Sequence, residues 1–262
     1  MELVIDDATG FARDRQFSRR YALDHFHIPC RKATPAERLE PFERYRRGFM
    51  KWSSRRRPFE KRKYVEQEGI DFDKRLLALK VNGVIYLDGL WQSEQYFKDV
   101  QEVIREELRI VPPTDELNQR IAEEICNSNA VALHVRWFNA PGSMVSHNLS
   151  VDYYHRAIAL MEENIDSPRY FLFSDAPDAA RVLLSLPESK VVFVSHNQGD
   201  AYVDLWPMSQ CKHFITANST FSWWGAWLGN EQNKTVLTPD LQLGGITAWG
   251  FDGLIPGEWV KV

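Results

Sequence analysis

The sequence is poor in cysteine, and its cysteines are unpaired. Cys30, Cys126 and Cys211 are far apart in a chain of 262 residues. No C-x-x-C pair, disulfide framework or cysteine–histidine cluster with metal-ligand spacing is present. Reduced thiols are therefore predicted, which excludes a small secreted scaffold held together by disulfides.

Long hydrophobic runs are also missing. No segment approaches the roughly 20 apolar residues that a membrane-spanning helix requires. Met1 leads directly into the short apolar run Leu3–Ile5, without the basic and apolar regions of a signal peptide. These absences predict a cytoplasmic protein, and they leave peripheral association with the inner face of the membrane open.

Neither sign of charge is in large excess. The chain has 32 basic and 36 acidic residues, so no nucleic-acid partner is predicted. Basic residues are concentrated in residues 13–63, which include Arg55-Arg56-Arg57 and Lys61-Arg62-Lys63. Such a run is usually a solvated face. The alternative is a non-enzymatic binding module that uses the run to contact lipid or nucleic acid.

The C-terminal half alternates regularly between apolar runs and amphipathic segments. Residues 130–135 form a continuous apolar run, as expected of a strand covered on both faces. The alternation predicts an α/β fold with a parallel, doubly wound sheet. The strands are predicted at 130–135, 170–173, 191–194, 214–216 and 236–238, and the helices at 150–164, 177–186, 200–211 and 220–228.

The N-terminal half is less periodic. Asn82-Gly83 between two apolar arms predicts a hairpin over residues 76–87. Ser93 and Thr114 are predicted to cap two further helices. The break at Pro112-Pro113 predicts two domains, 1–112 and 113–262.

Polar side chains follow four of the predicted strands. In a parallel sheet, ligands bind beyond the carboxyl ends of the strands. Arginine grips phosphate oxygens, and a helix N-terminus attracts anions. The set therefore predicts a diphosphate ligand. Its members are His134, Arg136, Asp175, Ser195, His196, Asn197, Asn218, Ser219 and Thr220.

Asp204 extends this prediction to the base of a nucleotide, because a carboxylate can accept hydrogen bonds from both N1–H and the amino group of guanine. His134 would supply another polar contact to the base. Simpler alternatives exist: Ser219 and Thr220 as a helix cap, Asp175 as another cap, and His134 as a core histidine. Convergence at one sheet edge favours binding. The Trp-rich segment 221–227 favours a buried helix over direct sugar stacking.

No metal or other cofactor is predicted. Asp71-Phe72-Asp73 matches the D-x-D pattern of metal-dependent transferases. The tripeptide is common, however, and here it follows no clear apolar strand.

Several segments together resemble the alpha-1,2-fucosyltransferases, the bacterial ones especially. The resemblance implies a GT-B-like fold of two Rossmann-type lobes, with 1–112 on the acceptor side and 113–262 binding the donor. It also implies inverting, metal-independent transfer of L-fucose from GDP-fucose to the 2-hydroxyl of a galactoside, carried on an oligosaccharide or glycolipid acceptor. The segments are Tyr21–Ile28, Tyr86–Phe97, Tyr170–Asp175, Asp204–His213 and Asn218–Leu228.

The same resemblance implies individual roles. Arg136 would meet the β-phosphate, His134 and Asp204 the guanine, and Ser219 with Thr220 a phosphate. Asp175 and Asn218 complete the predicted donor-binding set. Arg136, Asn139 and Asp88 are the predicted catalytic residues. Asp88 and Asp24 are alternative candidates for the general base.

The chain also departs from the family pattern. The family's H-x-R-R-x-D reads His134-Val135-Arg136-Trp137-Phe138-Asn139 here, so a tryptophan replaces an arginine and an asparagine replaces an aspartate. The family's first strand and its G-G-L-G-N-Q loop do not precede Leu3, so the N-terminal lobe is predicted to be incomplete. The alternative function is accordingly a truncated or inactive relative that at most binds GDP-fucose. The sequence does not indicate an oligomeric state.

Overall fold

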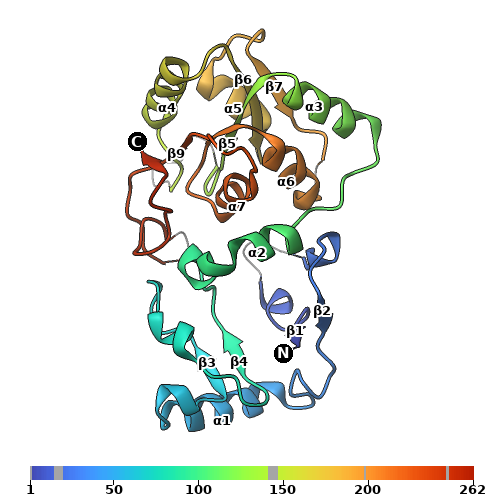
Figure 1. Ribbon diagram of the computed structural model, residues 1–262, viewed down its shortest axis with the longest axis vertical. Coiled ribbons are helices and arrows are strands. Elements are labelled where there is room, and N and C mark those ends of the chain that lie inside the picture. The colour runs from blue at the N-terminus through green and yellow to red at the C-terminus, as the bar shows by residue number, and fades with distance from the viewer. Residues whose placement is uncertain (1, 15–19, 141–146, 198, 246–247) are drawn as a thin grey trace. The chain divides into compact units, whose positions relative to one another are not determined.

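A computed structural model describes residues 2–14, 20–140, 147–197, 199–245 and 248–262. The chain folds into two compact units (Figure 1). The first unit extends to Leu108 and also includes Phe251–Leu254. The second unit comprises Arg109–Gly250 and Ile255–Val262.

The second unit is built on a six-stranded sheet in the order β10-β9-β8-β5-β6-β7. Every neighbouring pair of strands is parallel. The predicted α/β class with a parallel sheet is thus confirmed. The strands are β5 Asn129–Val135, β6 Pro168–Ser174, β7 Val191–Val194, β8 His213–Ile215, β9 Val236–Thr238 and β10 Val260–Lys261.

Helices connect these strands, and most begin where the sequence predicts. Ser150 caps α4 by accepting a hydrogen bond from the Tyr153 amide, as predicted. Asp115, not Thr114, caps α3, because its carboxylate accepts from both the backbone and the side-chain nitrogen of Asn118. The helices are α3 Glu116–Cys126, α4 Val151–Asn164, α5 Pro177–Leu184, α6 Ala201–Gln210 and α7 Thr220–Leu228.

The core of this unit follows the alternation of side chains along β5. Val131, Leu133 and Val135 pack with the buried faces of α4 and α5. The other face of the sheet lies against α3 and α6, and α6 packs against α7. Trp223 and Trp227 of α7 are buried, in agreement with the structural interpretation of the Trp-rich segment.

In the first unit, the described residues form two separate two-stranded sheets. In one, β1 (Leu3–Ile5) pairs with β2 (Cys30–Lys32), and in the other β3 (Tyr64–Glu66) pairs with β4 (Tyr86–Asp88); both pairs are parallel. The helices are α1 Glu43–Arg55 and α2 Gln101–Glu107. Within the described residues of this unit, six short 3-10 helices span Phe11–Arg13, Leu23–His25, Phe59–Lys61, Lys74–Ala78, Glu94–Tyr96 and Lys98–Val100.

Two predictions for the first unit are wrong. The hairpin over residues 76–87 does not form, because Asp73 caps a 3-10 helix that absorbs its first arm, while the second arm pairs with β3 instead. The helix predicted after Ser93 is divided into two 3-10 turns and α2. The Ser93 hydroxyl donates to the Gly253 carbonyl at 2.7 Å. Ser93 therefore caps a 3-10 turn and also anchors the segment Phe251–Leu254, which belongs to this unit although it comes late in the chain.

Candidate functional site

The strand order creates a switch point beside β5. The chain runs from β5 through β6 to β7, and then returns to place β8 on the other side of β5. Connections after β5 and β8 therefore leave the sheet in opposite directions, and ligands of doubly wound sheets bind in the crevice so formed. The residues that follow these two strands belong to the predicted diphosphate set. The strand order itself was not predicted.

His134, near the end of β5, is 5% exposed. Its ring lies 5.4 Å from the ring of Phe221 on α7, measured between centroids. Among the described residues, its Nδ1 atom has no hydrogen-bond partner. Burial lowers the pKa of His134 to about 3, and the charge of Arg136 adds to the shift. The imidazole is therefore neutral, and it can make a polar contact with a ligand.

Arg136 leaves the end of β5 beside Asp175. Its Nη1 atom lies 2.8 Å from a carboxylate oxygen of Asp175, and both side chains are about one-third exposed. The pairing of β5 with β6 places the two residues side by side. Asp175 also accepts a hydrogen bond from the Trp137 amide at 3.0 Å. Asp175 thus holds the guanidinium at the sheet edge, where it can meet an anion.

The start of α7 forms the other side of the switch point. Ser219 is the N-cap, and its hydroxyl accepts from the Phe221 amide at 3.3 Å. Thr220 is exposed at the first helical position. Asn218 is buried, and its Oδ1 atom has no partner within the part of the chain described. The first amides of such a helix attract anions.

The His147 backbone connects the two sides. Its amide donates to Oδ1 of Asn139 at 2.9 Å, and its carbonyl accepts from Nδ2 of Asn218 at 3.0 Å. The structure therefore brings Asn139 and Asn218 together. At this position Asn139 acts through an acceptor oxygen, a role that the family's aspartate could also perform. The asparagine differs from it in carrying no charge.

Asn148 fixes the turn after β5. Its Oδ1 atom accepts from the amides of Phe138 and Asn139 at 2.7 and 3.1 Å, and its Nδ2 atom donates to the Asn139 carbonyl at 3.0 Å. Sequence reasoning missed this residue. In the sequence, an asparagine that forms hydrogen bonds to a distant turn looks the same as an asparagine that is simply exposed before a helix cap.

A second polar cluster lies where β7 ends. Asp204 of α6 accepts from Nδ2 of Asn197 at 2.8 Å. The amides of Asn197 and Asn118 bond reciprocally, at 2.9 and 3.0 Å, and Nε2 of His196 lies 3.0 Å from Oδ1 of Asn118. Asn118 was also missed by sequence reasoning. Its only signal is a polar residue in the buried stripe of α3 that contains Ile121 and Ile125.

Burial raises the pKa of Asp204 to about 6, although the hydrogen bond from Asn197 opposes the shift. The carboxylate is therefore mostly ionised at neutral pH. Adjacent strands lie about 4.8 Å apart, so the end of β7 is roughly 10 Å from the end of β5. An extended nucleoside diphosphate can bridge such a distance.

The remaining predicted catalytic residue, Asp88, lies in the first unit on β4. It pairs with Lys51 at 2.8 Å and accepts from the Tyr64 hydroxyl at 2.8 Å. Burial raises the pKa of this carboxyl, but the bonds from Lys51 and Tyr64 outweigh it, and the net shift is downward. Asp24, the other candidate base, pairs with Lys32 at 2.6 Å. The lowered pKa of Asp88 does not favour proton acceptance.

The D-x-D carboxylates have structural partners. Asp71 accepts from the Asp252 amide at 3.1 Å, and Asp73 pairs with Arg75 at 2.6 Å while capping a 3-10 helix. Over the described ranges, no group of three or more His, Cys, Asp or Glu side chains is arranged to hold a metal ion. No helix in those ranges is both long and apolar enough to cross a membrane.

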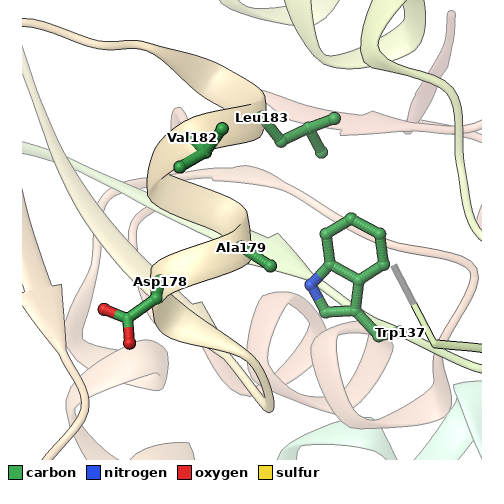
Figure 2. Close-up of a pocket in the computed structure, with 5 residues that line it drawn as sticks. All are labelled: Trp137, Asp178, Ala179, Val182 and Leu183. Atoms are coloured by element: carbon green, nitrogen blue, oxygen red, sulfur yellow. The ribbon is translucent and has the colours of Figure 1, made fainter. Parts of the chain in front are cut away.

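One cavity lies beside the switch point rather than in it. It has a volume of about 430 Å³ and is lined by Trp137 and four residues of α5. Figure 2 shows the Trp137 ring next to Ala179 and Leu183, with the Asp178 carboxylate pointing away. This lining is apolar and offers nothing to a diphosphate. A second cavity of about 370 Å³ reaches Ser195 and His196, at the end of β7.

Comparison with known protein sequences gives three findings. Residues 49–243 match the model of glycosyl transferase family 11, a range that contains every residue of the switch point. An alpha-1,2-colitosyltransferase from Escherichia coli is 29% identical over 208 residues, which are 73% of this chain and 68% of that protein. The O-antigen biosynthesis glycosyltransferase WbnK from Escherichia coli is 37% identical over 121 residues, 44% of this chain and 40% of that protein.

Among solved structures, the chain matches NodZ alpha-1,6-fucosyltransferase soaked with GDP-fucose. The TM-score is 0.45 at 17% identity, covering 64% of this chain and 58% of that chain. The present chain thus spans well under two-thirds of NodZ and of WbnK.

Proposed function

The chain belongs to glycosyl transferase family 11, and from this premise we propose that it transfers L-fucose from GDP-fucose to the 2-hydroxyl of a galactoside. The acceptor is an oligosaccharide or glycolipid. The observation that carries the proposal is the switch point between β5 and β8, because Arg136 follows the first of these strands and α7 follows the second. Two buried polar atoms there, on His134 and Asn218, have no partner among the described residues.

The donor fits this edge of the sheet in a defined direction. The diphosphate lies against Arg136 and the first amides of α7, which supply a fixed positive charge and unpaired donors. The guanine lies toward the end of β7, where Asp204 accepts from N1–H and the amino group. His134 contributes a neutral polar contact between these two ends.

The reaction is a single displacement with inversion. The bond from C1 of the sugar to the diphosphate oxygen breaks as the acceptor oxygen bonds to C1, and the acceptor hydroxyl loses its proton. Negative charge develops on the departing diphosphate. Donors aimed at such charge are each worth about 10²–10³ in rate, and Arg136 with the start of α7 provides them.

Transfer from GDP-fucose to lactose, followed with radiolabelled fucose, tests the proposal. We expect turnover that EDTA does not change, because Asp71 and Asp73 already serve other groups. Loss of turnover in EDTA and its recovery with Mn²⁺ would instead assign these two carboxylates to a metal. GDP binding without transfer would favour the inactive relative, with Trp137 and Asn139 as the responsible replacements. GDP-colitose, assayed in parallel, tests the sugar that the name of the Escherichia coli relative gives.

GDP affinity should fall as the pH falls through about 6. Recognition of guanine requires the ionised form of Asp204, whose pKa is about 6, so affinity should drop about tenfold between pH 7 and pH 5. The pKa of Asp204 in the folded protein lies above its ordinary value of 3.8, so protonation of Asp204 stabilises the folded state. The expected loss of GDP affinity at low pH would therefore not result from unfolding caused by this residue.

Titration calorimetry of the wild type and of Asp204→Asn over this pH range measures the effect. Protonation of the nucleotide's own phosphate is common to both proteins. The substitution should therefore remove only the part of the pH dependence that comes from Asp204. Identical pH profiles would show that Asp204 does not contact the base.

A further inference from the structure

Helix α1 of the first unit exposes its aromatic side. Phe42, which precedes the helix, is 70% exposed, and within the helix Tyr45 is 79%, Phe49 67% and Trp52 53% exposed. Intervals of three and four residues place them on one stripe. The rings of Phe49 and Trp52 stack at 5.8 Å between centroids. Among the described residues, nothing buries this stripe.

The opposite side of α1 is polar and attached to the unit. Arg47 pairs with Asp6 at 2.5 Å, and Lys51 pairs with Glu66 and Asp88 at 2.7 and 2.8 Å. The helix is thus held by ion pairs, while its apolar side faces outward. This is the reverse of an ordinary surface helix, which turns its apolar stripe to the core. An exposed apolar patch of this kind marks an interaction surface.

Arginines surround the aromatic stripe. The guanidinium of Arg56 lies 3.6 Å from the centroid of the Trp52 ring. Arg44, Arg46 and Arg57 are also exposed. Glu43 is the one acidic residue in the helix. Successive residues of a helix are rotated by about 100° around its axis, and this rotation places Glu43 on the side opposite the aromatic stripe.

We propose that the exposed side of α1, comprising Phe42, Tyr45, Phe49, Trp52 and the neighbouring arginines, docks on an anionic phospholipid bilayer. Aromatic rings enter the boundary between headgroups and acyl chains, while guanidinium groups on the helix and directly after it meet lipid phosphates. The positive charge of the arginines favours an anionic bilayer over the other candidates for this surface. A second copy of the chain would bring arginine against arginine, and duplex nucleic acid would leave the rings in water.

Vesicle co-sedimentation of the full chain tests the proposal. We expect binding to vesicles that contain phosphatidylglycerol and much weaker binding to phosphatidylcholine alone. Replacing both Phe49 and Trp52 by serine should weaken binding at least about tenfold. Arg56→Gln with Arg57→Gln should weaken it about fivefold for each charge removed. These side chains are exposed, so the variants should melt like the wild type.

Matched variants in the second unit serve as controls. Leu117 and Val182 are exposed apolar residues, and replacing both by serine should leave vesicle binding unchanged. The same holds for Arg120→Gln with Arg156→Gln, which removes two exposed charges.

Equal binding by the wild type and the Phe49/Trp52 variant would overturn the proposal, as would equal binding to both kinds of vesicle. A dimer in sedimentation equilibrium that this variant dissociates would assign the surface to a second copy instead. Binding to single- or double-stranded DNA, lost in the same variant, would assign it to nucleic acid.

Discussion

Arg136→Ala is expected to lower kcat/KM for fucosyl transfer by about 10²–10³-fold. The guanidinium stands at the end of β5, held by Asp175 at 2.8 Å, and β5 is one of the two strands that form the switch point. In the proposed reaction, the charge that develops on the departing diphosphate meets this guanidinium. Removing it should reduce the rate more than the affinity for GDP, because the interaction is strongest in the transition state.

Arg136→Lys and Arg169→Ala make this test specific. Lysine keeps the charge but loses the planar fork that grips two oxygens, so it should recover only part of the rate. Arg169 is also an ion-paired arginine beside the same sheet, bound to Glu124 at 2.6 Å, but it lies near the amino end of β6. Its alanine variant should keep wild-type turnover. An Arg136→Ala enzyme with nearly wild-type kcat/KM would remove Arg136 from the donor site.

Asp204→Ala is expected to raise the Kd for GDP by about 10²-fold and the Kd for ADP very little. Hydrogen bonds to a charged group contribute about 1.5–3 kcal/mol each, and guanine offers Asp204 two donors. Adenine presents no such pair of donors, so the affinity for ADP should depend little on Asp204. The substitution should therefore remove the preference of the protein for GDP over ADP as well as most of its affinity for GDP.

Asp200→Ala is the matched control, since Asp200 precedes the same helix without making a side-chain cap. It should bind both nucleotides like the wild type. Asn197→Ala should give a smaller loss that is also selective for GDP, because Asn197 orients Asp204 through a 2.8 Å hydrogen bond. An equal loss of GDP and ADP in Asp204→Ala would show that Asp204 supports the fold rather than the base.

Local patterns predicted the second unit well because its elements are locally encoded. Residues 191–194, 220–228 and 236–238 form the predicted strand, helix and strand. Each has an uninterrupted apolar run or a defined cap. The short edge strand β10 was not predicted, since two exposed residues, one apolar and one charged, are too few to form a periodic pattern. The hairpin at Asn82-Gly83 failed because the Asp73 cap, ten residues upstream, competes for the first arm.

In the candidate site, too, some residues could be predicted from the sequence and others could not. Side chains at the carboxyl ends of parallel strands can be predicted, because the sheet brings those ends to one edge. The pair of Arg136 with Asp175 follows from that geometry. Asn118 and Asn148 could not be found in this way, because their partners are tertiary. Residues 141–146 of the connection after β5 lie outside the described residues.

A crystal structure of the chain with GDP tests the central claim most directly. It should place phosphate oxygens within hydrogen-bond distance of the Arg136 guanidinium and of the first amides of α7, with the guanine edge against Asp204. GDP bound elsewhere, for instance in the apolar cavity beside Trp137, with Arg136 still paired only to Asp175, would contradict the account.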